Sequence, residues 1–148
     1  MKTNMKWILA AALLGSLGVK AADKEKVREH AVEERRETKA DIDKRIASIN
    51  RLDNRQAAMR IGMAEVSKQT AVPLPKIEAE HKEHPGVGLG GLFMAHELAV
   101  HTQKPVEHFI NAHKEGKSWN ELATASQVSL HEIDAKLARV EDAMRNAK

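Results

Sequence analysis

The chain has no cysteine and no tyrosine, and phenylalanine and tryptophan occur only twice each among its 148 residues. The absence of cysteine excludes disulfides, thiolate metal sites and cysteine nucleophiles, so that a folded state depends on burial and association. Aromatic residues make up 3% of the chain and runs of β-branched residues are missing, which leaves little material for strands. Alanine, glutamate, lysine, leucine and arginine dominate, and these are strong helix formers. The composition therefore predicts an all-α fold.

The first 21 residues have the organisation of a secretory signal peptide. A basic head with Lys2 and Lys6 precedes an apolar run over residues 7–19, and residues 19–21 form a small-residue cleavage site. The run is shorter than the ~20 apolar residues that span a bilayer. We therefore expect residues 1–21 to be removed, and the mature chain to be exported to the periplasm or the extracellular space without an integral membrane anchor.

Cleavage changes the charge balance of the chain. The full sequence has 24 basic and 21 acidic residues, and its pI is near 9.2. The signal peptide contains Lys2, Lys6 and Lys20 and no acidic residue, so the mature chain keeps 21 basic residues against 21 acidic ones. A neutral chain lacks the basic excess that attracts nucleic acid, and we expect no nucleic-acid partner.

Residues 23–68 predict one long helix, because this range contains no proline and Gly62 is its only glycine. Apolar residues recur along one helical face from residue 42 to residue 66, and before Ile42 they thin to Val27 and Ala31. A helix of this length exceeds the width of a small domain. We therefore expect its apolar stripe to bind a protein partner or a second copy as a coiled coil. The apolar stripe consists of Ile42, Ile46, Ile49, Leu52, Met59, Met63 and Val66.

Pro73 and Pro75 predict the end of this helix and a domain boundary. The expected parts of the mature chain are a long charged helix (22–70), a hinge rich in proline and glycine with a short helix (71–91), and a C-terminal helical domain (92–148). The glycines at 86–91 formally match the G-x-G-x-x-G pattern of dinucleotide sites. Because no βαβ unit is predicted around them, we expect a flexible or tightly packed loop that lets helices approach closely.

The C-terminal domain is predicted to contain about four short to medium helices. The first spans about 92–102, and the second opens at Pro105 and ends at Gly116. Serine followed by glutamate three residues later predicts the capped start of two more helices. The two pairs are Ser118 with Glu121 and Ser129 with Glu132.

The last helix and Trp119 are the expected core of this domain. Trp119 follows a cap residue, where its large side chain can pack on Phe109 and Leu122. Apolar residues recur at helical spacing along the whole of the last helix, which predicts one continuous buried face. They are Leu130, Ile133, Leu137, Val140 and Met144.

Residues 102–123 resemble a segment of small secreted bacterial α-helical proteins, in which a helix start is followed by e-G-k-G-W-x-e-I-A. The resemblance implies export and a helical fold, and it transfers no catalytic residue. The residues that match are Lys104, Val106, Glu115, Gly116, Lys117, Trp119, Glu121 and Ala123. The residues that depart from the pattern are Gln103, Pro105, Ser118 and Leu122.

Eight histidines lie in the mature chain, and histidine is the commonest metal ligand. His81 and His84 are three residues apart, and Glu97 and His101 are four apart on one helical face, so either pair is a candidate for zinc or copper. No H-E-x-x-H motif accompanies them. The alternatives are solvent-facing or interfacial histidines and a role in pH sensing.

Residues 121–140 also resemble the pattern of a helix-turn-helix, with 130–140 as the second helix. Glu132 and Asp134 at its start present acceptors where DNA contacts need donors. No combination of nucleophile and base is evident, and Ser118 and Ser129 are explained as caps. The sequence therefore favours an exported, non-enzymatic scaffold or interaction protein, with divalent metal binding or a helix-turn-helix-like domain as alternatives.

Overall fold

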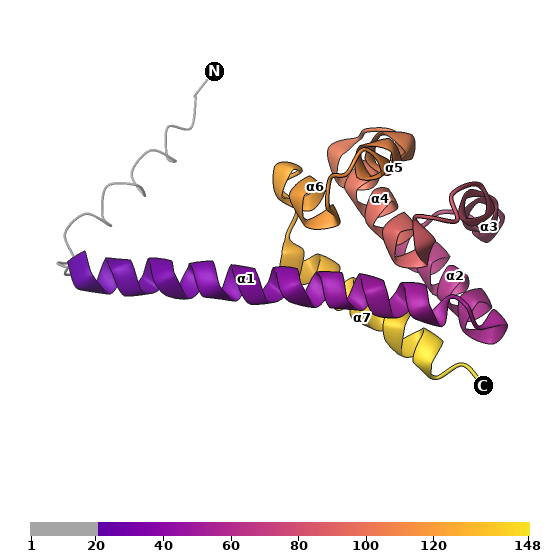
Figure 1. The fold of residues 1–148 in the computed structure, drawn as a ribbon, viewed down its shortest axis with the longest axis horizontal. Helices are drawn as coiled ribbons and strands as arrows, with labels where there is room; N and C mark the ends of the chain where they lie inside the picture. The colour runs from indigo at the N-terminus through magenta and orange to yellow at the C-terminus, as the bar shows by residue number, and fades with distance from the viewer. Residues whose placement is uncertain (1–20) are drawn as a thin grey trace, which may run out of the picture. The chain divides into compact units, whose positions relative to one another are not determined.

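The computed structural model describes residues 21–148, and within them the chain forms seven α-helices and no β-strand (Figure 1). The prediction of an all-α fold is thereby confirmed. Apart from Ala21, the predicted signal peptide lies outside the described residues. Over the described range, each helix is too short or too polar to cross a bilayer.

The chain divides into two units, residues 1–35 and residues 36–148. The described part of the first unit is the beginning of α1 (Ala21–Leu52), and every residue from 21 to 35 is exposed. We call residues 21–35 the charged segment, because four basic and five acidic side chains occur in it. The second unit contains the rest of α1 and the six other helices. The range 71–91, predicted as a hinge, lies within the second unit.

A turn interrupts the range that was predicted as one helix over 23–68. α1 ends at Leu52, and α2 (Gln56–Thr70) begins after Arg55, whose backbone is extended with φ −98° and ψ 119°. Asp53 and Asn54 are weak helix formers because their short polar side chains can hydrogen-bond to nearby backbone groups in place of the helical hydrogen bonds. Asn54 Nδ2 donates to the Arg51 carbonyl at 3.4 Å. The turn lets α1 and α2 pack into one core instead of continuing as a rod.

The prolines end α2 and begin α3 (Leu74–Glu83). Ala71 takes the left-handed conformation with φ 57°, and Pro73 is the residue before the first turn of α3. Pro75 lies inside that first turn, where a missing N–H leaves no helical hydrogen bond unmade. α3 thus lies within the range 71–91 in which a short helix was predicted.

The glycine run opens α4 (Gly88–Thr102) and lies directly against α1. Gly88 has φ +68°, and a Cβ at this position would come within 2.5 Å of the Asn50 side chain. Asn50 Oδ1 accepts from Gly90 N at 2.9 Å, and Asn50 Nδ2 donates to the Val87 carbonyl at 3.4 Å. The glycines therefore provide close helix approach at a helix start and not in a loop. The remaining helices are α5 (Val106–Lys114), α6 (Trp119–Ala125) and α7 (Leu130–Arg145).

Local capping explains where α5, α6 and α7 begin and end. Gly116, with φ +103°, lies just beyond α5 in the conformation that glycine adopts most easily. Ser118 Oγ accepts from Glu121 N at 3.2 Å and Glu121 Oε2 accepts from Ser118 N at 2.7 Å, which makes a complete capping box. At α7, Ser129 Oγ accepts from Glu132 N at 3.3 Å.

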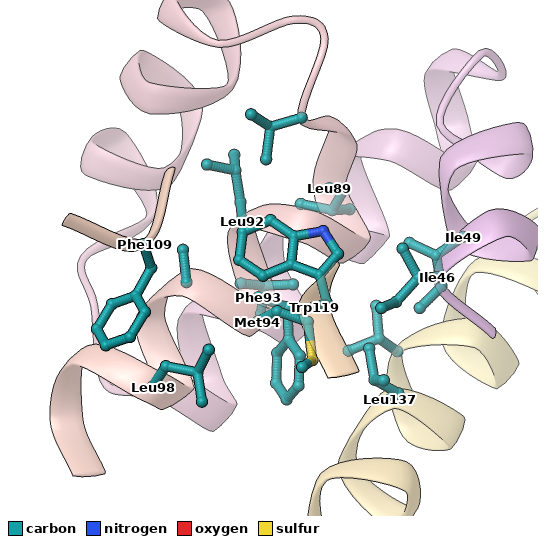
Figure 2. Close-up of a cluster of buried hydrophobic side chains, with 14 of the residues drawn as sticks. Ile46, Ile49, Leu89, Leu92, Phe93, Met94, Leu98, Phe109, Trp119 and Leu137 are labelled. Atoms are coloured by element: carbon teal, nitrogen blue, oxygen red, sulfur yellow. The ribbon is translucent and has the colours of Figure 1, made fainter. Parts of the chain in front are cut away.

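α4 is the central helix of the second unit, with α2, α3, α5, α6 and α7 packed around it. Eleven of its residues are buried, and Figure 2 shows Leu92, Phe93 and Leu98 among the side chains of the apolar cluster. α7 packs along α2 and buries one continuous apolar face. That face consists of Ile133, Leu137, Val140 and Met144.

Candidate functional site

The apolar stripe, which the sequence predicted to bind a partner, lies in the core of the second unit. Figure 2 shows Ile46 and Ile49 of α1 on the same side of the cluster as Leu137 of α7. A coiled-coil seam must be exposed in the free monomer, whereas this stripe already has its apolar contacts within the chain. Its buried residues are Ile42, Ile46, Ile49, Met63 and Val66, and Leu52 and Met59 are half-buried against the same core.

The predicted metal ligands of α3 have separate partners. His81 Nε2 lies 2.5 Å from Asp53 Oδ2, so the pair joins the turn between α1 and α2 to α3. Lys114 Nζ donates to His84 Nδ1 at 3.0 Å on the protein surface. The second buried oxygen of Asp53, Oδ1, has no hydrogen-bond partner. The two histidines therefore stabilise different interhelical contacts and do not converge.

In the part of the chain that the structure describes, the other two predicted ligands, Glu97 and His101, do not share a contact partner with His81 or His84. Lys136 Nζ donates to Glu97 Oε2 at 2.5 Å, which ties α4 to α7. His101 is exposed near the end of α4. Within residues 21–148, no group of three or more histidine, aspartate or glutamate side chains is placed to hold a metal ion.

A buried pair between α3 and α4 was not predicted from the sequence. His96 Nε2 lies 2.5 Å from Glu80 Oε2, and the two residues expose 2% and 8% of their surface. Lys76 Nζ lies 3.7 Å from the other carboxylate oxygen of Glu80. Burial of either polar group alone would be costly, and the contact offsets part of that cost. The one available signal was His96 itself, an ionisable residue that directly follows the apolar run of residues 92–95.

Trp119 is buried at the start of α6 and exposes 4% of its surface. Its ring stacks on His113 with the centroids 4.3 Å apart and the planes at 23°. Gly91 of α4 leaves space for the indole, because a Cβ there would lie 3.1 Å from the Trp119 ring. The stacking on His113 was not expected, and together with the close approach of Gly91 it makes Trp119 connect α4, α5 and α6.

The residues of the helix-turn-helix interpretation lie in α6 and α7. Residues 126–129 join the two helices, and Gln127 has φ +56°. α7 packs along α2, and Arg45 of α1 binds Asp134 on a further side of the helix. His131 and Glu132 are the exposed residues of its first turn. A recognition helix needs a free face with donors, and this arrangement gives no support to DNA reading by α7.

A groove of about 390 Å³ lies between α1 and α7 in the second unit, which we call the α1–α7 groove. Arg45 of α1 donates from Nε to Asp134 Oδ1 at 2.6 Å and from Nη1 to Glu141 Oε2 at 3.1 Å. Arg145 of α7 donates from Nη2 to Glu141 Oε1 at 2.6 Å and to Ser48 Oγ at 3.1 Å. The groove is lined by Asp41, Lys44, Arg45, Ser48, Arg51, Glu141 and Arg145.

Hydrogen bonds among the residues of the groove shift the pKa values of Glu141 and Arg45. Burial raises the pKa of Glu141, but the hydrogen bonds from Ser48, Arg145 and Arg45 outweigh it and leave the pKa below 4.5. The hydrogen bond to Asp134 is the largest cause that raises the pKa of Arg45, and it outweighs the desolvation of the guanidinium. A carboxylate with two guanidiniums is therefore maintained at neutral pH.

Comparison of the chain with known protein families, with curated proteins and with solved structures found no match to any of them. The resemblance of residues 102–123 to small secreted bacterial helical proteins stays a prediction. The function is therefore inferred from the contacts and charges of the chain itself.

Proposed function

We propose that the protein is an exported, non-enzymatic interaction protein, and that a second copy of the chain binds to the charged segment of α1. The predicted signal peptide supports export. The observation that carries the proposed association is that residues 21–35 are helical and that each of them is exposed.

A helix of this kind gains little stability from its own chain. Residues 21–35 extend α1 beyond the part that packs in the core, and a helix that is polar on all sides depends on ion pairs or on a partner. Val27 is 68% exposed and Val32 is 51% exposed, so neither side chain is used in the core. Contact with another chain would bury these side chains and stabilise the segment.

Six of the nine charged residues of the segment form two stripes of opposite sign. Residues at spacings of three, four and seven share a helical face. By that spacing Lys24, Arg28 and Arg35 share one side of the helix, while Glu25 and Glu29 share the neighbouring side with Glu33. The basic stripe of one copy therefore complements the acidic stripe of another, which favours self-association over a strongly acidic or basic partner.

The free energy of exposed ion pairs determines how strongly two copies of the chain are expected to associate. Each contributes about 0.2–1 kcal/mol and is screened by salt. A few such pairs with two valines give a weak complex that forms at high protein concentration and low ionic strength.

Sedimentation equilibrium of the mature chain, residues 22–148, tests this proposal. The average molar mass should rise with concentration at low salt and return to the monomer value at high salt. Glu25→Lys with Glu29→Lys should abolish the rise, and so should Lys24→Glu with Arg28→Glu. A mixture of the two variants should associate again, because their stripes are then complementary.

The matched control is Glu107→Lys with Glu115→Lys, two exposed acids of the second unit. This variant changes the net charge as the first one does and should associate like the unmodified chain. A wild-type mass that stays monomeric at every concentration, or equal effects of the control and the charged-segment variants, would contradict the proposal.

A further inference from the structure

We propose that the α1–α7 groove binds a small phosphorylated polyol, with the phosphate held by its basic side chains. This inference is independent of the charged segment, because the groove is built from residues 41–51, 141 and 145 of the second unit. Its support comes from the positions of four cations, from the donors that remain on them, and from the polarity of the lining.

The two guanidiniums of Arg45 and Arg145 already make hydrogen bonds within the chain. Arg45 uses Nε and Nη1, and Arg145 uses Nε and Nη2, in their contacts with Asp134, Glu141 and Ser48. Within the described contacts, each guanidinium therefore keeps one terminal nitrogen for an oxyanion. Guanidinium groups bind phosphate oxygens strongly and with defined geometry, and side chains that are already ordered lose less entropy on binding.

Two further cations lie at the rim of the groove. Lys44 is 78% exposed and lies 3.8 Å from Asp41, a distance too long for a hydrogen bond. Arg51 is exposed, and its side chain makes no ion pair or hydrogen bond within the described part of the chain. The four basic groups outnumber the acids Asp41, Glu141 and Asp134, so the groove keeps a positive balance that attracts an anion.

The size and lining of the groove define the rest of the ligand. A volume of about 390 Å³ is within the range of about 300–1,000 Å³ found for small-molecule sites. Every lining side chain is polar or charged and none is aromatic, so a nucleotide base has no ring on which to stack. Ser48 and Asp41 provide oxygen acceptors for hydroxyl groups. A phosphate attached to a short polyol matches this set of groups.

Calorimetric titration of the mature chain with glycerol 3-phosphate tests the proposal, with glycerol and inorganic phosphate as comparison probes. We expect binding of glycerol 3-phosphate, weaker binding of phosphate and none of glycerol. Arg51→Gln should weaken binding about tenfold, the value of one charge-assisted hydrogen bond. Arg60→Gln, the matched control at an exposed arginine of α2, should leave binding unchanged.

Amide chemical shifts provide a second readout of the same titration. With the ligand they should change at residues 41–51 and 141–145 and not in α5. Absence of binding at millimolar probe concentrations would show that the Arg45–Glu141–Arg145 cluster is only an interhelical contact and would overturn the proposal. Equal binding of inorganic phosphate and glycerol 3-phosphate, or equal losses in Arg51→Gln and Arg60→Gln, would overturn it as well.

Discussion

The two parts of α1 differ sharply in burial although they belong to the same helix. In the charged segment, residues 21–35 of α1, every side chain is exposed, whereas Ile42 and Ile49 in the second part of α1 expose no surface at all. Both parts are rich in good helix formers and in charge. The difference is the spacing of large apolar residues, which is regular only after residue 41.

This contrast separates helix formation, which propensity provides, from stability, which depends on packing. Propensity produces helix in both parts, but most of the stability of a helix in a protein comes from packing of its apolar face. Arg45, Ser48 and Asn50 add polar contacts from the second part to α7 and α4. Substitutions in the two parts should therefore have very different consequences.

The largest expected effect is that of Ile46→Asp. The carboxylate would replace a side chain that is 7% exposed in the core, and an unpaired buried charge is among the most destabilising changes known. We expect a loss of roughly 4 kcal/mol or more in the free energy of unfolding, measured by urea denaturation followed by circular dichroism. Val32→Asp in the charged segment is the matched control and should change the free energy by less than about 0.5 kcal/mol.

The same variant, Ile46→Asp, distinguishes two possible roles of the apolar stripe, as part of the core or as an interface with a partner. If the stripe is a core element, Ile46→Asp unfolds the second unit. A variant that keeps its full stability and only lowers the molar mass of an oligomer would instead show that Ile46 faces a partner, as the sequence first indicated.

A smaller effect is expected from Glu141→Gln, which breaks the ionic contacts between the second part of α1 and α7. The variant should lose about 1–3 kcal/mol at neutral pH, the usual value of hydrogen bonds to a charged group. Because the pKa of Glu141 is lowered in the folded state, its contribution is complete above about pH 4.5 and is lost as the pH falls through the folded pKa. The difference between wild type and variant should therefore shrink in acid.

Urea denaturation at a series of pH values measures that difference. Asp142→Asn is the matched control, because Asp142 is the next residue of α7 and its side chain is exposed. A wild-type minus Glu141→Gln difference that is constant from neutral pH to well below pH 4.5 would contradict the assigned role of the carboxylate.

The smallest measurable effect should come from Ser118→Ala. Loss of the side-chain cap of α6 should cost about 0.5–2 kcal/mol, compared with no more than about 0.5 kcal/mol for Val27→Ala in the charged segment. The hydrogen bonds from Ser118 lower the pKa of Glu121, and the bond from the backbone N–H has a larger effect than the bond from the hydroxyl. In Ser118→Ala the pKa of Glu121 should therefore rise, as NMR titration of its side chain can show. An unchanged Glu121 pKa would mean that the hydroxyl does not bind the carboxylate.

Local chemistry made part of this fold predictable. The capping pair at Ser118 and Glu121, the glycine at 116 and the two prolines at 73 and 75 each act within a few residues, so the sequence indicates helix ends near them. The turn at Asp53 and Asn54 was missed because neither residue forbids a helix. The turn is favoured by packing of α1 and α2 in one core and by the contact of Asp53 with His81.

Contacts between distant residues were not predictable in the same way. Arg45 and Glu141 are 96 residues apart, and nothing in either local pattern shows that their helices lie together. The same holds for Glu80 and His96, whose pairing depends on which faces of α3 and α4 meet. A histidine next to an apolar run, as at His96, indicates a buried partner without identifying it.

Hydrogen exchange along α1 tests most directly whether the two parts of this helix differ as described. At high salt and low protein concentration, where the mature chain should be monomeric, amides of residues 42–52 should be protected by opening free energies close to that of global unfolding. Amides of residues 23–35 should exchange orders of magnitude faster. Uniform protection along the whole of α1 under these conditions would contradict the description, because the charged segment would then have to be packed within the monomer.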